Sequence, residues 1–356
     1  MMMSIYRSEK NPIIKPENIR PFLSNFEVIG VFNCGVTKFN DEILLLLRVA
    51  EKPIGGSSDE ILIPLLNPKT GSISIKVFDK NDPSIDFSDP RFLRSTREGC
   101  YLTSISHLRI ARSKNGIDFN IDIKPALFPE KEYEESGIED PRITCIDEKY
   151  YISYSAVSNI TGITACLAST SDFRTFTKHG IIFMPDNKNV AIFPEKIKSK
   201  YYALSRPVSG EFCVNNIWIS ESYDLIHWGN HKRLMGARKG YWDSLRVGGG
   251  AVPFKIDEGW LEIYHGASED GRYCIGAVLL DYNEPWKVIA RSKEPVIEPE
   301  IDYELNGFFG GVVFTCGVLY EKGVVKIYYG AADTTIAYAE VRLSDILEKM
   351  EYQAGL

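Results

Sequence analysis

The sequence contains no pair of cysteines in a C-x-x-C spacing, and therefore shows no signature of a zinc ribbon or a thiol redox motif. Its seven cysteines are odd in number and widely spaced, and most lie inside apolar runs. This distribution predicts buried free thiols and a reducing compartment. The cysteines are Cys34, Cys100, Cys145, Cys166, Cys213, Cys274 and Cys316.

The sequence also lacks an excess of basic residues and any long hydrophobic run. Lys and Arg total 41 and Asp and Glu total 48, which gives a net charge of −7. This balance argues against a nucleic-acid or anionic-membrane partner, although a mildly acidic protein can still hold a local anion site. The N-terminus has no apolar signal core, and no stretch is long enough to cross a bilayer. We therefore expect a cytoplasmic protein.

Helix-forming patterns are scarce in the 356 residues, of which 44% are hydrophobic. Such a chain can bury a large core, and we expect one all-β domain over residues 1–356 with an N-terminal arm over about residues 1–30. The clearest helix is predicted over 343–352 and is expected to cover an edge strand. Ser344 can cap its start, and Ile346, Leu347 and Met350 fall on one face.

One pattern recurs along the chain: a distinctive loop, a strand, a polar turn and a second strand. Five copies at intervals of roughly 50 residues predict a five-bladed β-propeller of four-stranded antiparallel sheets. A sixth blade is possible, but it would lack the distinctive loop that opens the other five. The competing fold is a two-sheet sandwich, which would not require a repeated sequence pattern. The loops of the five copies begin at Phe32, Glu139, Phe193, Gly248 and Gly310.

Two copies of the repeat need comment. In the third copy, the first strand is expected at Lys196–Ile197, directly after Phe193-Pro194-Glu195. The interval between the first and second copies is about twice the usual length. Its segment 59–113 is interpreted as an elaboration of the first blade, and the polar stretch 79–89 within it could serve an interface in a homo-oligomer.

The stretch Gly137-Ile138-Glu139-Asp140-Pro141-Arg142 places two adjacent acids beside a proline and an arginine. Pro141 disfavours the helical region for the preceding residue, so Asp140 is expected to be extended at a strand entrance. An acid held next to another acid and a guanidinium is a candidate proton donor. The alternative for this stretch alone is a surface turn with a solvated ion pair.

Blades of a propeller aim equivalent positions at one central channel, so the repeat predicts which polar residues converge there. Four basic or potentially basic groups among them would need an anion or carboxylates to offset their repulsion, and Arg suits phosphate geometry. Local pairing of each charge is the alternative. The second strands end at Arg48, Ser155, Arg206, His265 and Gly330, with Asp333 just beyond; the preceding loops supply Asn33, Asp140, Lys188 and Asp243.

The chain resembles glycoside hydrolase family 130, the inverting β-mannoside phosphorylases and β-mannosidases, over most of its length from Asn11-Pro12 to about Asp333. Motifs that carry the resemblance occur in the family's order. They are Phe32-Asn33-Cys34-Gly35, Arg48-Val49, Gly137 to Arg142, Asn187-Lys188, Phe193-Pro194-Glu195-Lys196, Ser205-Arg206-Pro207, Trp242-Asp243, Gly259-Trp260-Leu261, Tyr264-His265-Gly266 and Tyr329 to Thr334.

The resemblance implies a five-bladed propeller and a set of roles. Asp140 matches the family's general acid, and Lys188, Arg206 and His265 match its phosphate-binding positions. Phosphate would attack the anomeric carbon, so cations are needed where a hydrolase would need a second carboxylate. No metal or organic cofactor is implied, and inorganic phosphate is a co-substrate. Substrate binding is assigned to Asn33, Arg48, Arg109, Glu139, Arg142, Asp243 and Asp333.

The segments 103–109 and 111–113 resemble the branch that acts on β-1,2-linked mannosides, either mannobiose or longer oligomannan. Cys34 replaces the family's usual proline, and Asn189 stands where an acid is common. Two alternatives are retained. One is an inverting β-mannosidase with Glu195 or Glu304 as base, and the other is a non-catalytic mannoside-binding propeller.

Overall fold

The structure, a computed structural model, describes residues 4–208 and 215–352. Almost all regular structure in these residues is β-strand, with two short α-helices, α1 (Asp302–Leu305) and α2 (Leu343–Glu348), and two 3₁₀ turns, η1 (Pro16–Asn18) and η2 (Glu132–Glu134). The all-β prediction is therefore confirmed.

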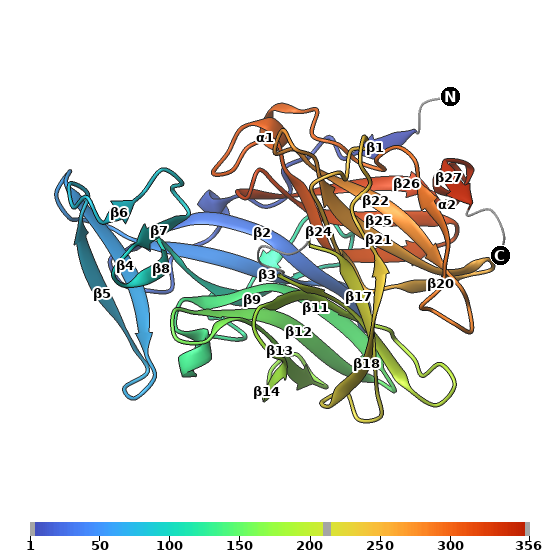
Figure 1. Cartoon of the computed structure of the whole chain (residues 1–356), viewed down its shortest axis with the longest axis horizontal. Helices are drawn as coiled ribbons and strands as arrows, with labels where there is room; N and C mark the ends of the chain where they lie inside the picture. Colours follow the sequence, from blue (N-terminus) through green and yellow to red (C-terminus); the bar gives the residue numbers. More distant parts are fainter. Residues whose placement is uncertain (1–3, 209–214, 353–356) are drawn as a thin grey trace.

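The strands form antiparallel groups that follow one another along the chain (Figure 1). One eight-stranded sheet holds the first two groups, which are joined by a single parallel bridge between Gly137 and Ser106. Its first group is β2 (Phe26–Phe39), β3 (Glu42–Pro53), β9 (Ile105–Ser113) and β10 (Asn120–Ile121). Its second group is β11 (Gly137–Ile146), β12 (Lys149–Ser158), β13 (Gly162–Thr170) and β14 (Thr177–Phe183).

Three further sheets complete the body of the protein. The last of them includes the N-terminal strand β1, which pairs with β26, whereas the C-terminal strand β27 pairs with β23 in the fourth group. The third group is β15 (Asn187–Ile192), β16 (Tyr201–Pro207), β17 (Ile217–Ser222) and β18 (Trp228–Met235). The fourth is β19 (Arg246–Gly248), β20 (Phe254–Ile256), β21 (Gly259–Ala267), β22 (Tyr273–Leu280), β23 (Val288–Ser292) and β27 (Met350–Tyr352). The fifth is β24 (Val313–Glu321), β25 (Val324–Ala331), β26 (Thr335–Arg342) and β1 (Ile5–Arg7).

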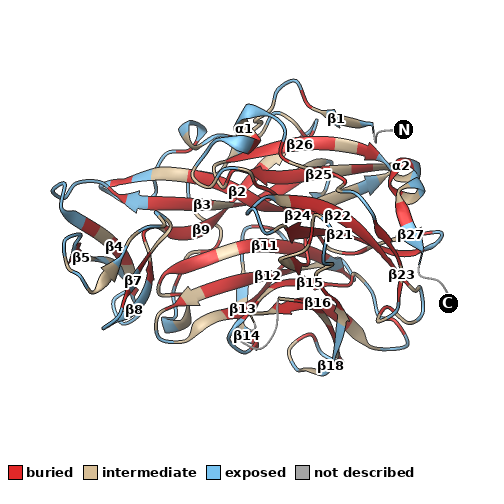
Figure 2. Cartoon of the chain, turned by 45° about the horizontal axis from the view of Figure 1, so that its top comes forward, coloured by how far each residue is buried: buried red, intermediate tan, exposed pale blue. Residues whose placement is uncertain are grey.

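The long interval in the first group forms two small sheets that lie to one side of the body, at the left in Figure 1. They have a small core of their own, which includes Ile61, Phe78 and Leu93. Figure 2 shows many exposed residues on these strands, whereas the strands of the body are mostly buried. The small sheets are β4 (Glu60–Asn67) with β5 (Ser72–Asp79), and β6 (Ile85–Asp86) with β7 (Phe92–Ser95) and β8 (Gly99–Leu102).

The first two strands of each group pair in a common register. Five residues are predicted to end the second strands of the hairpins. Each of them pairs with a residue at the equivalent position of the first strand of its own hairpin. The pairs are Phe32–Arg48, Glu139–Ser155, Lys188–Arg206, Gly248–His265 and Phe314–Gly330.

Directly after this pair, the first strand of three groups bulges. Asn33, Asp140 and Asn189 occupy these bulges with φ values of 50°, 49° and 57°. A left-handed residue in a bulge turns its side chain out of the strand's normal alternation. The prediction that Asp140 is extended is therefore wrong: Pro141 excludes the right-handed helical region, and Asp140 adopts the left-handed one within β11.

Two predicted elements differ from the structure. In the third hairpin the first strand is β15, which precedes Phe193, and residues 196–197 contribute only an isolated bridge between Ile197 and Lys200. The C-terminal helix ends at Glu348, because residues 350–352 pair with β23 as β27 and Met350 packs into the core. Arg342, rather than Ser344, occupies the N-cap position.

Two buried glutamates occupy matching positions in a repeated P-E-x-x-Y-E-x-x-G segment, at residues 129–137 and 299–307. Glu304 accepts hydrogen bonds from the backbone N–H groups of Glu300 and Ile301, from the Tyr329 hydroxyl at 2.7 Å and from Arg7 Nε at 2.9 Å. Glu134 makes the same contacts with the backbone of Glu130 and Lys131, with Tyr154 and with Lys178. Each glutamate therefore anchors a turn to its neighbouring sheet.

The Glu304 anchor predicts a large loss of stability on truncation. Glu304→Ala would leave the Arg7 guanidinium and the Tyr329 hydroxyl without their buried acceptor, and we expect a loss of about 3 kcal/mol, measured by urea unfolding. Glu300→Ala is the matched control, because this partner of Arg7 has a side chain 57% exposed. Its loss should stay below about 1 kcal/mol. Equal losses in both variants would contradict this role.

Candidate active site

A cavity of about 400 Å³ brings together seven of the predicted residues. It is lined by residues of all five strand groups and by residues at one of the two small sheets, the one formed by β6, β7 and β8. Acidic and basic side chains are both present, so the cavity is polar on part of its wall. The predicted residues that line it are Asn33, Arg48, Glu139, Asp140, Lys188, Arg206 and Asp333.

Arg48 connects the two adjacent acids in this cavity. Its Nη1 donates to Asp140 Oδ1 at 2.9 Å, and its Nη2 donates to Glu139 Oε1 at 2.6 Å. The guanidinium also lies over the Phe32 ring, 4.5 Å from its centre. Asn33 Nδ2 donates to the same Asp140 oxygen at 3.0 Å. The Asp140 carboxylate is thus held by groups from β2 and β3, next to its own strand.

The two acids differ in their affinity for a proton. Burial raises the pKa of Glu139, and Arg48 only partly offsets that effect. Burial acts in the same direction on Asp140, but Arg48, Arg142, Asn33 and Lys188 together hold its pKa below the usual value. Asp140 is therefore ionised at neutral pH.

Asp333 lies in the same cavity and forms no ion pair with any residue of 4–208 or 215–352. Burial raises its pKa to about 6, and Arg48 does not compensate fully because it already pairs with the other two acids. Like Asp140, Asp333 has a left-handed backbone, with φ of 49°.

Lys188 and Arg206 face each other across β15 and β16 and form the cationic side of the cavity. Neither makes an ion pair with a residue that the structure describes, and Arg206 Nε has no hydrogen-bond partner there. Burial, with Arg206 nearby, lowers the pKa of Lys188 to about 8, and burial lowers the pKa of Arg206 to about 10. Two uncompensated cations in a polar cavity form a candidate site for an anion.

His265 is buried behind this pair, and it does not line the cavity. Its Nε2 lies 3.4 Å from Arg206 Nη1 and 3.3 Å from Asn189 Nδ2. Both neighbours are donors, so Nε2 must accept and the ring is neutral. Burial and the adjacent Arg206 lower its pKa well below the usual value. His265 is therefore neutral here and contacts Arg206, and its part in phosphate binding stays a prediction.

The model of glycoside hydrolase family 130, described as β-1,4-mannooligosaccharide phosphorylase, matches residues 90–352. The chain belongs to this family.

Relatives in family 130 include phosphorylases of β-1,2-linked mannosides. A β-1,2-mannobiose phosphorylase of Listeria innocua serovar 6a is 49% identical over 355 residues, 99% of this chain and 100% of the relative. A 1,2-β-oligomannan phosphorylase of Thermoanaerobacter sp. (strain X514) is 41% identical over 68% of this chain and 80% of the relative. The solved structure of the Listeria innocua enzyme in complex with β-1,2-mannobiose superposes with a TM-score of 0.95, covering 98% of this chain and 99% of that chain.

Three residues predicted to bind substrate do not line the cavity. Arg109 is buried against Glu51 at 3.1 Å and the Arg20 carbonyl at 2.8 Å. Asp243 is fully buried between Arg238 and Arg291, at 3.0 and 2.5 Å. Arg109 and Asp243 therefore already have buried partners. Neither is placed to contact a ligand in the cavity.

Arg142, the third of these residues, supports the cavity from behind. Its Nη1 donates to the Asp140 carbonyl at 2.9 Å, and its Nε and Nη2 donate to the carbonyls of Gly250 and Gly249 at 2.7 and 2.8 Å. These bonds tie the bulge that carries Asp140 to the fourth strand group. Arg142 thus positions the acid.

The structure adds cavity residues that the repeat did not predict. Arg91 and Phe92 come from the small sheets, and Phe308, Arg246 and Tyr273 come from segments of the fourth and fifth groups. The aromatic residues that flank the repeat positions in the sequence, such as Tyr264, Tyr328 and Tyr329, are core residues. The aromatic residues that do line the cavity lie in loops or at strand ends. The position of such a segment in the fold cannot be read from its own sequence.

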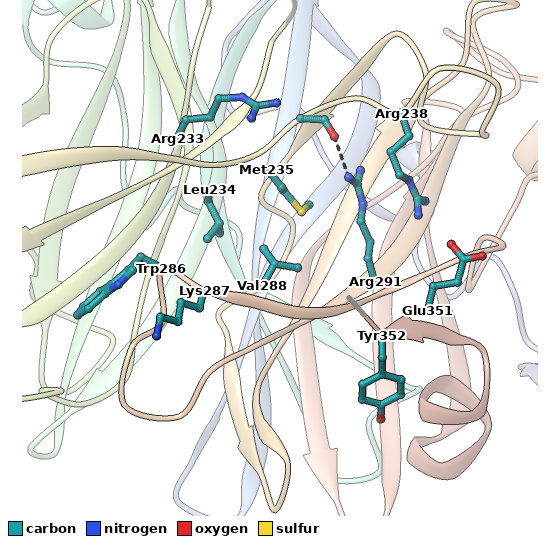
Figure 3. Close-up of a pocket in the computed structure, with 11 residues that line it drawn as sticks. Arg233, Leu234, Met235, Arg238, Trp286, Lys287, Val288, Arg291, Glu351 and Tyr352 are labelled. Carbon is teal, nitrogen blue, oxygen red and sulfur yellow. Dashed lines mark hydrogen bonds between the residues drawn. The ribbon is translucent and has the colours of Figure 1, made fainter. Parts of the chain in front are cut away.

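A second cavity of about 610 Å³ lies between β18, β23 and β27 and holds none of the predicted residues. Figure 3 shows Arg291 and Arg238 in its wall, with Arg291 donating to the Gly236 carbonyl at 2.7 Å. Both arginines already pair with Asp243, so the charge in this cavity is largely satisfied. The first cavity is therefore the candidate active site.

Other predicted features can be compared with the described residues. Cys34, Cys166, Cys274 and Cys316 are buried free thiols, as predicted, whereas Cys100 and Cys145 are exposed, and Cys213 lies outside the described residues. No group of three or more metal-binding side chains is found within 4–208 and 215–352. None of the helices in that part of the chain has the length and apolar character needed to cross a membrane.

Asp333, which is half-buried in the cavity wall, and the fully buried Asp243 should respond oppositely to neutralisation. The raised pKa of Asp333 means that its charge lowers stability once the pH exceeds its unfolded pKa, with the full cost above about pH 6. Asp333→Asn should therefore stabilise the protein by about 1 kcal/mol at pH 7 and give no gain near pH 4. Asp243→Asn should cost about 3 kcal/mol. Urea unfolding at both pH values tests this, and equal losses in the two variants would contradict it.

Proposed function

We propose that this protein is an inverting phosphorylase that cleaves β-1,2-linked mannosides with inorganic phosphate and releases α-mannose 1-phosphate. The observation that carries the proposal is the charge arrangement in one cavity. Asp140 is held there by Arg48, whereas Lys188 and Arg206 lack carboxylate partners among the described residues. Support also comes from the full-length, 49% identical relative, which makes mannobiose the first substrate to test.

The strand groups are proposed to be the five blades of one propeller domain. The common register of the five hairpins supports this arrangement, because it places equivalent residues at equivalent depth. Contacts of β2 with both β24 and β11, of β12 with β15 and of β22 with β24 support a closed ring. The pairing of β1 with β26 would then attach the N-terminal strand to the fifth blade.

Phosphate is proposed to bind at Lys188 and Arg206. A dianion there would supply the charge that offsets the two cations, both of which line the cavity. A hydrolase would instead need a carboxylate to activate water. Neither acid considered for that role lines the cavity: Glu195 pairs with Lys255, and Glu304 is enclosed by Arg7 and Tyr329.

Asp140 is proposed to supply the proton. In the reaction a phosphate oxygen forms a bond to the anomeric carbon while the glycosidic C–O bond breaks, and the leaving oxygen takes the proton from Asp140, by way of a mannose hydroxyl in the family's pattern. The lowered pKa leaves Asp140 ionised at neutral pH, so it must take up a proton from solvent as the substrates bind. Lys188 helps to keep its pKa low, and a phosphate on Lys188 would cancel that effect and raise the pKa of Asp140. Binding of the nucleophile would thus prepare the acid.

The role of Asp140 can be tested by Asp140→Asn, which keeps the hydrogen bonds of the side chain but cannot donate the acidic proton. We expect turnover of β-1,2-mannobiose to fall by at least about a thousandfold, while calorimetry shows mannobiose binding within a few-fold of wild type. The wild-type enzyme should release mannose 1-phosphate only when phosphate is present. If free mannose forms at the same rate without phosphate, the phosphorylase proposal is wrong. If the protein binds mannobiose but does not turn it over at any phosphate concentration, it is a non-catalytic binding module.

The lowered pKa of Lys188 predicts a specific pH dependence. Because Lys188 loses its proton near pH 8, kcat/KM for phosphate should fall above that pH. Lys188→Arg should shift this decline towards about pH 10, near the lowered pKa of Arg206, even if its maximum activity is lower. The measurement is kcat/KM for phosphate from pH 6 to about 10 in both proteins. An unchanged alkaline decline in the variant would exclude Lys188 as its source.

A further inference from the structure

Three arginines gather around one carboxylate in the wall of the second cavity, which has a volume of about 610 Å³. Arg291 Nη2 and Arg238 Nη2 both donate to Asp243 Oδ2, at 2.5 and 3.0 Å. Arg291 Nη1 also donates to the Gly236 carbonyl, and a Cβ added to Gly236 would collide with Arg233 Nη2. The guanidinium groups of all three arginines therefore lie around Gly236 and Asp243 (Figure 3).

The positive charge of this arginine group is not balanced. Asp243 gives both Arg238 and Arg291 a hydrogen-bonded partner, but a single carboxylate offsets only one guanidinium. Arg233 forms no ion pair within residues 4–208 and 215–352, and Arg238 Nη1 has no hydrogen-bond partner in that part of the chain. Glu351, an acid of the same wall, lies 3.7 Å from Lys293. Like charges crowded in this way favour a bound anion.

The rest of the cavity wall is apolar and aromatic. Trp286, Val288 and Tyr352 line it, and Tyr352 is 59% exposed. Figure 3 shows them below the guanidinium groups, with Glu351 beside Tyr352. An exposed tyrosine ring packs well on the apolar face of a sugar, and a carboxylate accepts hydrogen bonds from sugar hydroxyls. The two walls therefore suit a ligand with an anionic group at one end and a hydroxylated ring at the other.

We propose that the second cavity is a binding site for a phosphorylated monosaccharide. Its phosphate contacts Arg233 and the unpartnered Nη1 of Arg238, and its sugar ring packs on Tyr352. Arginine suits the geometry of a phosphate group. Inorganic phosphate would use the arginines but not the aromatic wall. The two cavities share no lining residue, so this inference does not depend on the proposed phosphorylase function.

The test measures the binding of mannose 6-phosphate by calorimetry, because the phosphate of this probe is not on the anomeric carbon at which the proposed reaction occurs. We expect wild type to bind it with a Kd below about 1 mM, and inorganic phosphate to displace it only at about tenfold higher concentration. Arg233→Gln changes an exposed residue and should weaken binding at least about tenfold. Tyr352→Ala should weaken it about fivefold.

Lys239→Gln is the matched control, because it removes an exposed positive charge next to Arg238 in the chain and does not line the cavity. It should bind mannose 6-phosphate within about twofold of wild type, as should Lys188→Ala in the first cavity. Thermal unfolding shows whether each variant is folded, and Tyr352→Ala carries the test if Arg233→Gln is not.

Three results would each overturn the proposal. Wild type does not bind mannose 6-phosphate, or Lys188→Ala rather than Arg233→Gln abolishes its binding, which places the probe in the first cavity. Alternatively, inorganic phosphate displaces the probe at an equal concentration, and the cavity then recognises the anion without the sugar. Phosphate-dependent release of mannose 1-phosphate by wild type is measured separately, so the proposed function stands or falls on its own result.

Discussion

The Arg48 guanidinium, held between Glu139 and Asp140, is the interaction on which the candidate site depends. Two carboxylates adjacent in the chain could not both stay ionised in a buried cavity without a cation between them. Arg48 comes from the neighbouring strand group, so the charge balance requires those two groups to be joined, as they are in one sheet. Packing of Arg48 on Phe32 fixes the guanidinium in this position. The ionisation of Asp140 is thus a property of the assembled fold.

The repeated backbone explains how single residues reach the cavity. Each hairpin brings one cross-strand pair to the same register, and a left-handed bulge follows in three groups, at Asn33, Asp140 and Asn189. Asp and Asn tolerate this conformation better than most other residues that have a side chain. Arg142 then fixes the second of these bulges by its bond to the Asp140 carbonyl. The same backbone device presents an amide in one group and an acid in another, so the groups share a geometry but differ in chemistry.

Much of this site could be predicted from the sequence, because strand periodicity and the ends of strands are local properties. The register of Arg48, Arg206 and His265 followed from the repeat alone. Charge and access could not be predicted in this way, because they depend on residues from other groups. Asp243 matches a family motif but is enclosed by Arg238 and Arg291. The end of the C-terminal helix depends in the same way on pairing with β23, which the sequence of the helix does not reveal.

The uneven distribution of charge in the cavity links the structure to the chemistry. On one side, Arg48 is fully used by two acids; on the other, Lys188 and Arg206 repel each other and lose affinity for protons because burial removes their solvation. Such an arrangement carries an electrostatic cost, which a bound anion would relieve. In the proposed reaction, binding energy is then available where the new bond forms, and the same anion weakens the hold of Lys188 on the ionised state of Asp140. A single electrostatic imbalance could therefore both recruit the nucleophile and load the acid.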